Sequence, residues 1–121
     1  MARILIVDDD EDLLTLVGAL LGIAGHVTES LTSAEGALET IRRFRPDLIL
    51  LDILIPGMSG GLLYRAIRAQ FGSQIPVLVC SATSMRIKCE SDSLLAHCPK
   101  PVEPNRLLAA IDNLLKLAAA P

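Results

Sequence analysis

At 121 residues, the chain is long enough to bury a core of its own as a single domain over residues 1–121, without disulfides or a structural metal. Its residues are 51% hydrophobic but only 2% aromatic, so we expect an aliphatic core, and residues 118–121 are interpreted as a frayed end or the start of a linker. The net charge of −3 and the lack of a basic cluster argue against a nucleic-acid-binding face, and we expect no direct contact with nucleic acid.

The N-terminal sequence lacks the apolar region and cleavage site of a signal peptide, and no apolar run approaches the roughly 18 residues of a membrane-spanning helix. We therefore expect a cytoplasmic protein that contacts no membrane. The three cysteines, Cys80, Cys89 and Cys98, are spaced nine residues apart, which fits neither a disulfide framework nor a paired metal-binding motif. Cys80 and Cys98 fall at the ends of expected strands and are interpreted as small core residues.

The first half of the chain predicts three strands separated by two helices. Arg3–Val7 is a β-rich run, and residues 11–24 follow it with acidic residues and then a helical pattern of leucines. His26–Glu29 predicts a weak edge strand. Residues 32–44 begin with a capping box, Thr-Ser-Ala-Glu, and predict the second helix. Leu48–Leu51 is an unbroken apolar run, which is typical of a central strand covered on both faces.

The second half continues the alternation of helix and strand. Residues 61–70 predict a helix, and Pro76–Cys80 predict a buried strand. Residues 85–95 mix apolar and turn-forming residues, so they predict a short or irregular helix. A fifth strand is expected to end near Cys98, and Pro104 is well placed to begin the final helix. This pattern predicts an α/β fold with five parallel strands in the order 2-1-3-4-5 and helices on both faces.

Polar residues stand at the carboxyl ends of the strands that this order makes central. Asp8 and Asp9 follow the first strand, Asp52 follows the third, and Ser81 follows the fourth. Lys100 lies just past the fifth and can reach the same edge of the sheet, which is where open α/β sheets place their chemistry. Asp52 taken alone is equally well explained as a turn residue, but the joint placement of these residues is far less ordinary.

Three carboxylates brought together repel one another, and a hard divalent cation relieves this repulsion. Oxygen ligands are what Mg²⁺ prefers, so Asp8, Asp9 and Asp52 form a plausible Mg²⁺ site. Lys100 adds a positive charge and Ser81 a hydroxyl donor. A carboxylate nucleophile, a metal and donors for the remaining oxygens are the groups that phosphoryl transfer requires.

Four stretches of the chain, in the same order, resemble one known family. They are ILIVDDDEDL from Ile4, PDLILLDILIPGMSG from Pro46, IPVLVCSA from Ile75, and Lys100-Pro101. Together they resemble the receiver domain of two-component response regulators, the flavodoxin-like family that includes the chemotaxis response regulator. The resemblance covers essentially the whole chain and implies a phosphorelay signalling domain, not an enzyme.

The resemblance also implies a role for each site residue. Asp52 would accept a phosphoryl group from a phosphohistidine on a sensor histidine kinase or a histidine phosphotransfer protein. Asp8, Asp9 and Asp52, with the backbone carbonyl of Leu54, would hold Mg²⁺. Ser81 and Lys100 would close on the phosphoryl group. A downstream effector would read this change on the face made by helix four, strand five and helix five.

Departures from the family pattern lie mostly on that output side. His97 stands where an aromatic switch residue, Tyr or Phe, is usual, and it could be a smaller, pH-sensitive switch or be exposed or simply packed. The segment between Ser81 and Lys100 is shorter than usual. The family's helix four, which corresponds to the short helix expected over residues 85–95, is therefore expected to be truncated. Val102 replaces a common Phe, and Ser59 replaces an acidic residue.

Other functions remain open at this point. The altered output side is compatible with a receiver-like interaction module that signals without phosphate. A phosphatase of the haloacid dehalogenase type would need a second Asp two residues after the nucleophile, where this chain has Leu54. A flavodoxin-type flavin carrier shares the fold, but the scarcity of aromatic residues and the acidic first loop argue against it.

Overall fold

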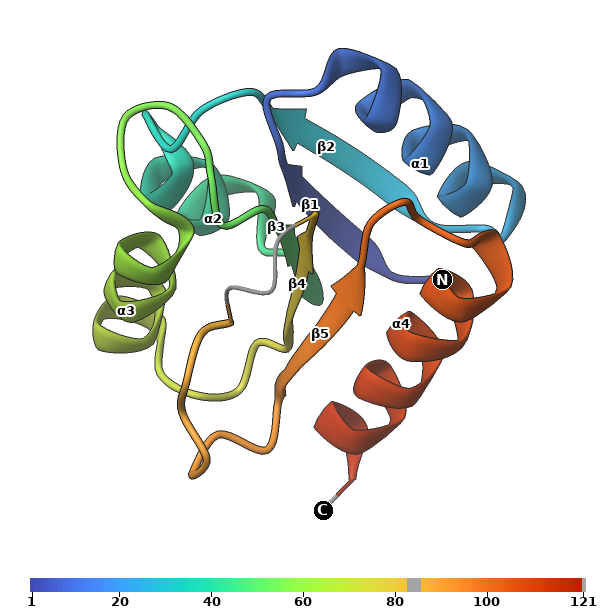
Figure 1. Ribbon diagram of the computed structural model, residues 1–121. Helices are drawn as coiled ribbons and strands as arrows, with labels where there is room; N and C mark the ends of the chain where they lie inside the picture. Colours follow the sequence, from blue (N-terminus) through green and yellow to red (C-terminus); the bar gives the residue numbers. More distant parts are fainter. Residues whose placement is uncertain (83–85, 121) are drawn as a thin grey trace.

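The computed structural model describes residues 1–82 and 86–120 and contains one parallel sheet with helices on both faces (Figure 1). The strand order β2-β1-β3-β4-β5 confirms the predicted flavodoxin-like topology. The strands are β1 (Arg3–Val7), β2 (Val27–Leu31), β3 (Leu48–Leu51), β4 (Val77–Ser81) and β5 (Leu95–Pro99). The helices are α1 (Glu11–Ile23), α2 (Ala37–Phe44), α3 (Gly60–Phe71) and α4 (Pro104–Ala119). Within the described part of the chain, no helix is both long and apolar enough to cross a membrane.

Two apolar layers cover the sheet, and the central strands contribute to both. Helices α2 and α3 lie on one face and α1 and α4 on the other (Figure 1). Because side chains alternate along a strand, Ile49 and Leu51 of β3 pack toward α2 and α3, while Leu48 and Leu50 pack toward α1 and α4. All four are buried, which explains why the run contains no polar residue.

The edge strands and cysteines agree with their predicted roles. β2 pairs only with β1 and is partly exposed, as expected for an edge strand. Cys80 and Cys98 lie opposite each other in the register of β4 and β5, and both are buried. Burial also raises the pKa of the Cys80 thiol, as expected for an inert core residue. α4 continues through Ala119, whereas Pro121, the last residue of the predicted frayed end, lies outside the described residues.

The second helix begins later than its capping box predicts. α2 starts at Ala37, and the hydroxyl of Ser33 accepts a hydrogen bond from the amide of Glu35 at 3.3 Å within the preceding turn. Gly36 explains the late start, because its φ of 75° places it in the left-handed region, which interrupts a right-handed helix. The capping-box prediction is therefore wrong in position, although the helix itself is present.

The helix predicted over residues 85–95 is absent from residues 86–94, and Met85 lies outside the described residues. Polar groups of this segment are bonded to partners on β5 and α3 instead of along a helix. The amide of Ile87 donates to Nε2 of His97 at 3.1 Å, and the carboxylate of Asp92 is held by α3. These bonds to distant partners fix the segment in an irregular conformation.

Candidate functional site

The site residues meet at the carboxyl edge of the sheet, as the strand order predicts. Asp8 follows β1, Asp52 follows β3, and Ser81 is the last residue of β4. The pairing of Val7 with Leu51 places the first two carboxylates at neighbouring strand ends. Asp8, Asp52 and Ser81 are only 2%, 8% and 9% exposed, which is unusual for polar residues and calls for partners.

Lys100 supplies the partner for the buried carboxylates. Its Nζ donates to Oδ2 of Asp8 at 2.7 Å and lies 3.4 Å from Oδ2 of Asp52. The Lys100 amide also donates to the carbonyl of Ser81 at 3.0 Å, which ties the end of β5 to the end of β4. The site therefore contains the cation and the two carboxylates that the sequence predicted.

A metal-binding geometry is present as well. Carboxylate oxygens of Asp8, Asp9 and Asp52 lie within 4.8 Å of one another. Asp9 is exposed, so the cluster opens to solvent on one side, and the amide of Asp10 donates to the second oxygen of Asp8 at 3.0 Å. Oxygen donors with open space for water fit a hard divalent cation such as Mg²⁺.

The surroundings of the site raise the pKa of both Asp52 and Lys100, which favours the neutral form of Asp52 and the charged form of Lys100. Burial, followed by the charge of Asp8, raises the pKa of the Asp52 carboxyl above its ordinary value, and Lys100 opposes this shift. Burial lowers the pKa of Lys100, but the hydrogen bond and charge of Asp8, together with Asp52, outweigh it and raise the pKa overall. The ammonium group of Lys100 therefore stays charged. A further cation near Asp52 would stabilise the ionised form of its carboxyl group.

The backbone around Asp52 is shaped by Gly60, the last residue of the stretch that begins at Pro46. A Cβ at Gly60 would lie 2.4 Å from the carbonyl oxygen of Asp52 and 2.7 Å from Cα of Ile53. The amide of Gly60 donates to the carbonyl of Ile53 at 2.7 Å. Only glycine lets the first turn of α3 approach this closely, so Gly60 fixes the loop that carries the site.

The other residues of this loop have clear structural roles. The hydroxyl of Ser59, which stands in place of an acidic residue, caps α3 by accepting from the amide of Leu62 at 3.2 Å. The amide of Leu54 makes a long contact of 3.5 Å with Oδ1 of Asp52. The role predicted for the carbonyl of Leu54 as a metal ligand stays a prediction.

His97 is half-buried on β5, so the alternative in which it is freely exposed does not hold. Its Nε2 accepts the hydrogen bond from the Ile87 amide, and this nitrogen must be unprotonated to do so. Burial lowers the pKa of the imidazole, and the charge of Arg86 lowers it further. The residue is packed against the segment before β5, and its role as a switch remains a prediction.

A polar cluster that the sequence reasoning missed holds that same segment to α3. Nε of Arg68 donates to Oδ2 of Asp92 at 2.7 Å, and the hydroxyl of Tyr64 donates to the same oxygen. Asp92 lies more than twenty positions after Tyr64 and Arg68, with β4 between them. No local motif links them, although Tyr64 and Arg68, four apart, do share one helix face.

Comparisons with known proteins agree with this geometry. The sequence model of the response regulator receiver domain matches residues 4–112. The DNA-binding response regulator MtrA of Mycolicibacterium smegmatis is 34% identical over 115 residues, which cover 94% of this chain and 50% of MtrA. The response regulator MprA of Mycobacterium leprae is 33% identical over 117 residues, covering 94% of this chain and 51% of MprA. The chain therefore spans about half the length of these relatives.

Solved structures show the same fold over almost the whole chain. A response regulator from Chloroflexus aurantiacus has a TM-score of 0.86 at 28% identity, covering 95% of this chain and 98% of that one. The BeF3-activated receiver domain of Klebsiella pneumoniae RstA has a TM-score of 0.83 at 29% identity, covering 94% and 98%.

One expectation from the sequence is wrong: that of no direct contact with nucleic acid. It rested on a net charge of −3 and on the lack of a basic cluster in 121 residues. MtrA is named a DNA-binding regulator, and this chain spans only about half of its length. The charge of this part therefore does not decide whether a protein of this kind contacts DNA.

Proposed function

This chain belongs to the response regulator receiver domain family, a family of two-component signalling, and we propose that it signals through Mg²⁺-dependent phosphorylation of Asp52. The observation that carries the proposal is the position of the Asp52 carboxylate, which lies 3.4 Å from Nζ of Lys100 and within 4.8 Å of the other acidic oxygens. This arrangement surrounds one buried nucleophile with the charges that a phosphoryl group requires.

In the proposed reaction, an Asp52 oxygen attacks the phosphorus atom of a phosphohistidine on a partner kinase or phosphotransfer protein. The new P–O bond forms as the P–N bond breaks. The electron pair of the P–N bond returns to the imidazole nitrogen of the donor. Asp8, Asp9 and Asp52, together with the carbonyl of Leu54, would hold Mg²⁺, which when bound offsets negative charge on the phosphoryl oxygens.

Phosphorylation would change the charge balance of the site. Asp52 would go from one negative charge to nearly two, with added acceptor oxygens. Lys100, now shared between Asp8 and Asp52, would be drawn toward the phosphoryl group, and the Ser81 hydroxyl would donate to it. Because Lys100 directly follows β5 and Ser81 ends β4, a shift of either would be passed to the adjacent ends of these two strands.

Labelling with acetyl phosphate tests this assignment. Wild type with Mg²⁺ is expected to gain one phosphoryl group by intact-mass spectrometry, and Asp52→Asn is expected to gain none. Asp112→Asn, which alters an exposed carboxylate on α4, serves as the control and should label like wild type. Equal labelling of Asp52→Asn and wild type would sink the proposal.

A second candidate is a receiver-like module that binds its partner without phosphate. The absence of a helix over residues 86–94 favours it, because a helix of the family's output face is expected there. Beryllofluoride with Mg²⁺ mimics the phosphoryl group, and its occupancy can be followed by ¹⁹F NMR. Partner affinity that stays the same at full occupancy would favour this second candidate.

The names of the relatives also bear on the output. MtrA is a DNA-binding response regulator, and we extend the proposal to DNA as the eventual target of signalling by this protein. Fluorescence anisotropy of the natural full-length protein with DNA from upstream of its own gene tests this step. Tighter binding with beryllofluoride is expected, and no binding in either state would contradict it.

A further inference from the structure

Residues 86–94, which we name the strap, lead into the start of β5 without forming a helix or strand (Figure 1). The strap is fastened to the rest of the molecule by a few polar contacts. One end is held by the bond from the Ile87 amide to Nε2 of His97. The other is held by Asp92, whose side chain is only 6% exposed.

Asp92 makes more contacts than any other polar side chain that the structure describes in the strap. Its Oδ2 accepts from Nε of Arg68 at 2.7 Å and from the hydroxyl of Tyr64. Its Oδ1 accepts from the amide of Leu94 at 3.0 Å, which closes a turn just before β5. A single carboxylate thus joins the strap both to α3 and to itself.

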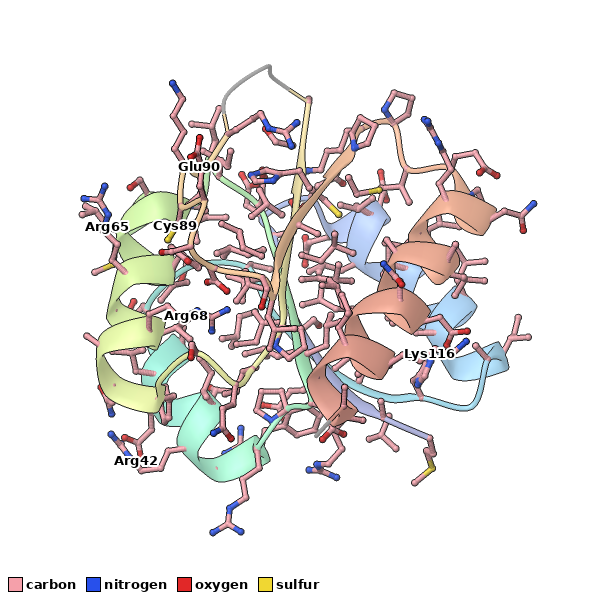
Figure 2. The ribbon with its side chains drawn as sticks, turned by 90° about the horizontal axis from the view of Figure 1, so that it is seen from below. Arg42, Arg65, Arg68, Cys89, Glu90 and Lys116 are labelled. Atoms are coloured by element: carbon pink, nitrogen blue, oxygen red, sulfur yellow. The ribbon has the colours of Figure 1, made fainter. Side chains whose placement is uncertain are left out.

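Arg68 anchors the α3 side of this cluster. Its Nη1 donates to the carbonyls of Ile75 at 2.7 Å and Gly72 at 3.3 Å, so the guanidinium is fixed by backbone as well as by Asp92. Figure 2 shows Arg68 directed from α3 toward the inside of the molecule, while Arg65 on the same helix points outward. Nη2 of Arg68 is buried and has no hydrogen-bond partner among the described residues.

The strap does not pack closely against α3 along its whole length. A groove of about 410 Å³ runs between them, lined by Tyr64 and Arg65 of α3 and by Lys88 and Ser91 of the strap. Cys89 of the strap also lines this groove, and Figure 2 shows Glu90 near it. The strap is also held by the Ile87–His97 bond, by the bond from the Val77 amide to the carbonyl of Leu94 at 2.8 Å, and by the partial packing of Ile87 and Cys89. The Asp92 cluster is its charged link to α3.

We propose that the strap opens as one unit while the sheet stays folded, and that Asp92 is the residue that holds it closed. Opening breaks the bonds from Asp92 to α3 and from Ile87 to His97 together. It exposes Tyr64 and Arg68, residue types that are enriched at the centres of protein interfaces. Few buried apolar contacts and many solvent-accessible backbone bonds are the features of segments that open locally.

Native-state hydrogen exchange of the unphosphorylated protein tests this proposal and does not depend on any reaction at Asp52. The reporter is the amide of Ile87, whose hydrogen bond goes to His97 and not to Asp92. Asp92→Asn keeps the shape of the side chain but removes the charge that pairs with Arg68. It is expected to speed exchange at Ile87 by roughly tenfold or more.

Two further variants make the result decisive. Glu90→Gln changes an exposed acid on the same strap and is expected to leave exchange at Ile87 unchanged. Ile111→Val weakens the core on the opposite face of the sheet, so it should speed exchange of the β3 amides by roughly fivefold and leave Ile87 unchanged. The proposal is overturned if Ile111→Val speeds Ile87 and β3 equally, or if Asp92→Asn leaves Ile87 as in wild type.

Discussion

At the level of single residues, the environment of Asp52, the proposed phosphorylation site, opposes folding. Its carboxylate is buried beside Asp8, and burial and that charge raise its pKa. A raised folded-state pKa means that the native state favours the neutral carboxyl. Folding is therefore unaffected below the unfolded pKa, about 3.9, and is disfavoured as the pH rises through the folded pKa.

Asp52→Asn is accordingly expected to stabilise the protein at neutral pH in the absence of Mg²⁺. The free energy of unfolding should rise by on the order of 1 kcal/mol at about pH 7, with a smaller difference at about pH 3, below the unfolded pKa, where the carboxyl is protonated in both states. Urea unfolding across this range measures the effect. Asp112→Asn should show no such dependence, and a neutral-pH loss of stability in Asp52→Asn would contradict the account.

At the scale of elements, the approach of α3 to the site loop depends on one glycine. Gly60→Ala would place a Cβ 2.4 Å from the carbonyl oxygen of Asp52, where backbone must move to make room. We expect a loss of roughly 2 kcal/mol or more in the free energy of unfolding. Urea unfolding is the measurement, and a loss below about 0.5 kcal/mol would contradict the close approach.

The neighbouring glycine provides a matched control for this prediction. Gly61 also lies in the first turn of α3, but a Cβ there has no atom within 4 Å. Gly61→Ala should therefore be neutral or stabilise the protein by about 0.5–1 kcal/mol, because alanine loses less backbone entropy in a helix. Gly60→Ala should thus lower the free energy of unfolding, whereas Gly61→Ala should leave it unchanged or raise it.

Elements held by local patterns were predictable, and those held by distant contacts were not. The unbroken apolar run Leu48–Leu51 predicted its strand because burial on both faces leaves no position for a polar residue. The helix predicted over 85–95 failed because Asp92 bonds to α3, a contact that no local propensity encodes. Gly36 likewise overrode a good capping box by adopting a left-handed conformation.

At the scale of the whole molecule, the fold itself made the site predictable. Once the strand order was inferred, the carboxyl ends of separate strands had to share one edge, which brings Asp8, Asp52 and Lys100 together across more than ninety residues. The surface that would pass the signal to a partner could not be predicted in this way. It depends on a partner, and residues 86–94, where the family resemblance implied a helix of the output face, form no helix.

Mg²⁺ should stabilise the folded molecule, because it would bind the native cluster and not the unfolded chain. We expect the midpoint of thermal unfolding of wild type to rise by several degrees at Mg²⁺ concentrations well above the dissociation constant. Asp9→Asn removes one exposed ligand without disturbing the buried ion pair, and it should weaken this increase. An equal increase in both proteins would exclude the cluster as the Mg²⁺ site.

The central claim is that Asp52, among the clustered carboxylates, forms the covalent bond to phosphorus. Sodium borohydride reduces an aspartyl phosphate to homoserine, and peptide mass mapping then locates the modified residue. After treatment of the wild-type protein with acetyl phosphate and Mg²⁺, the account predicts homoserine at position 52 alone. Homoserine at position 8 or 9, or none at position 52 in a protein that has gained a phosphoryl group, would contradict it.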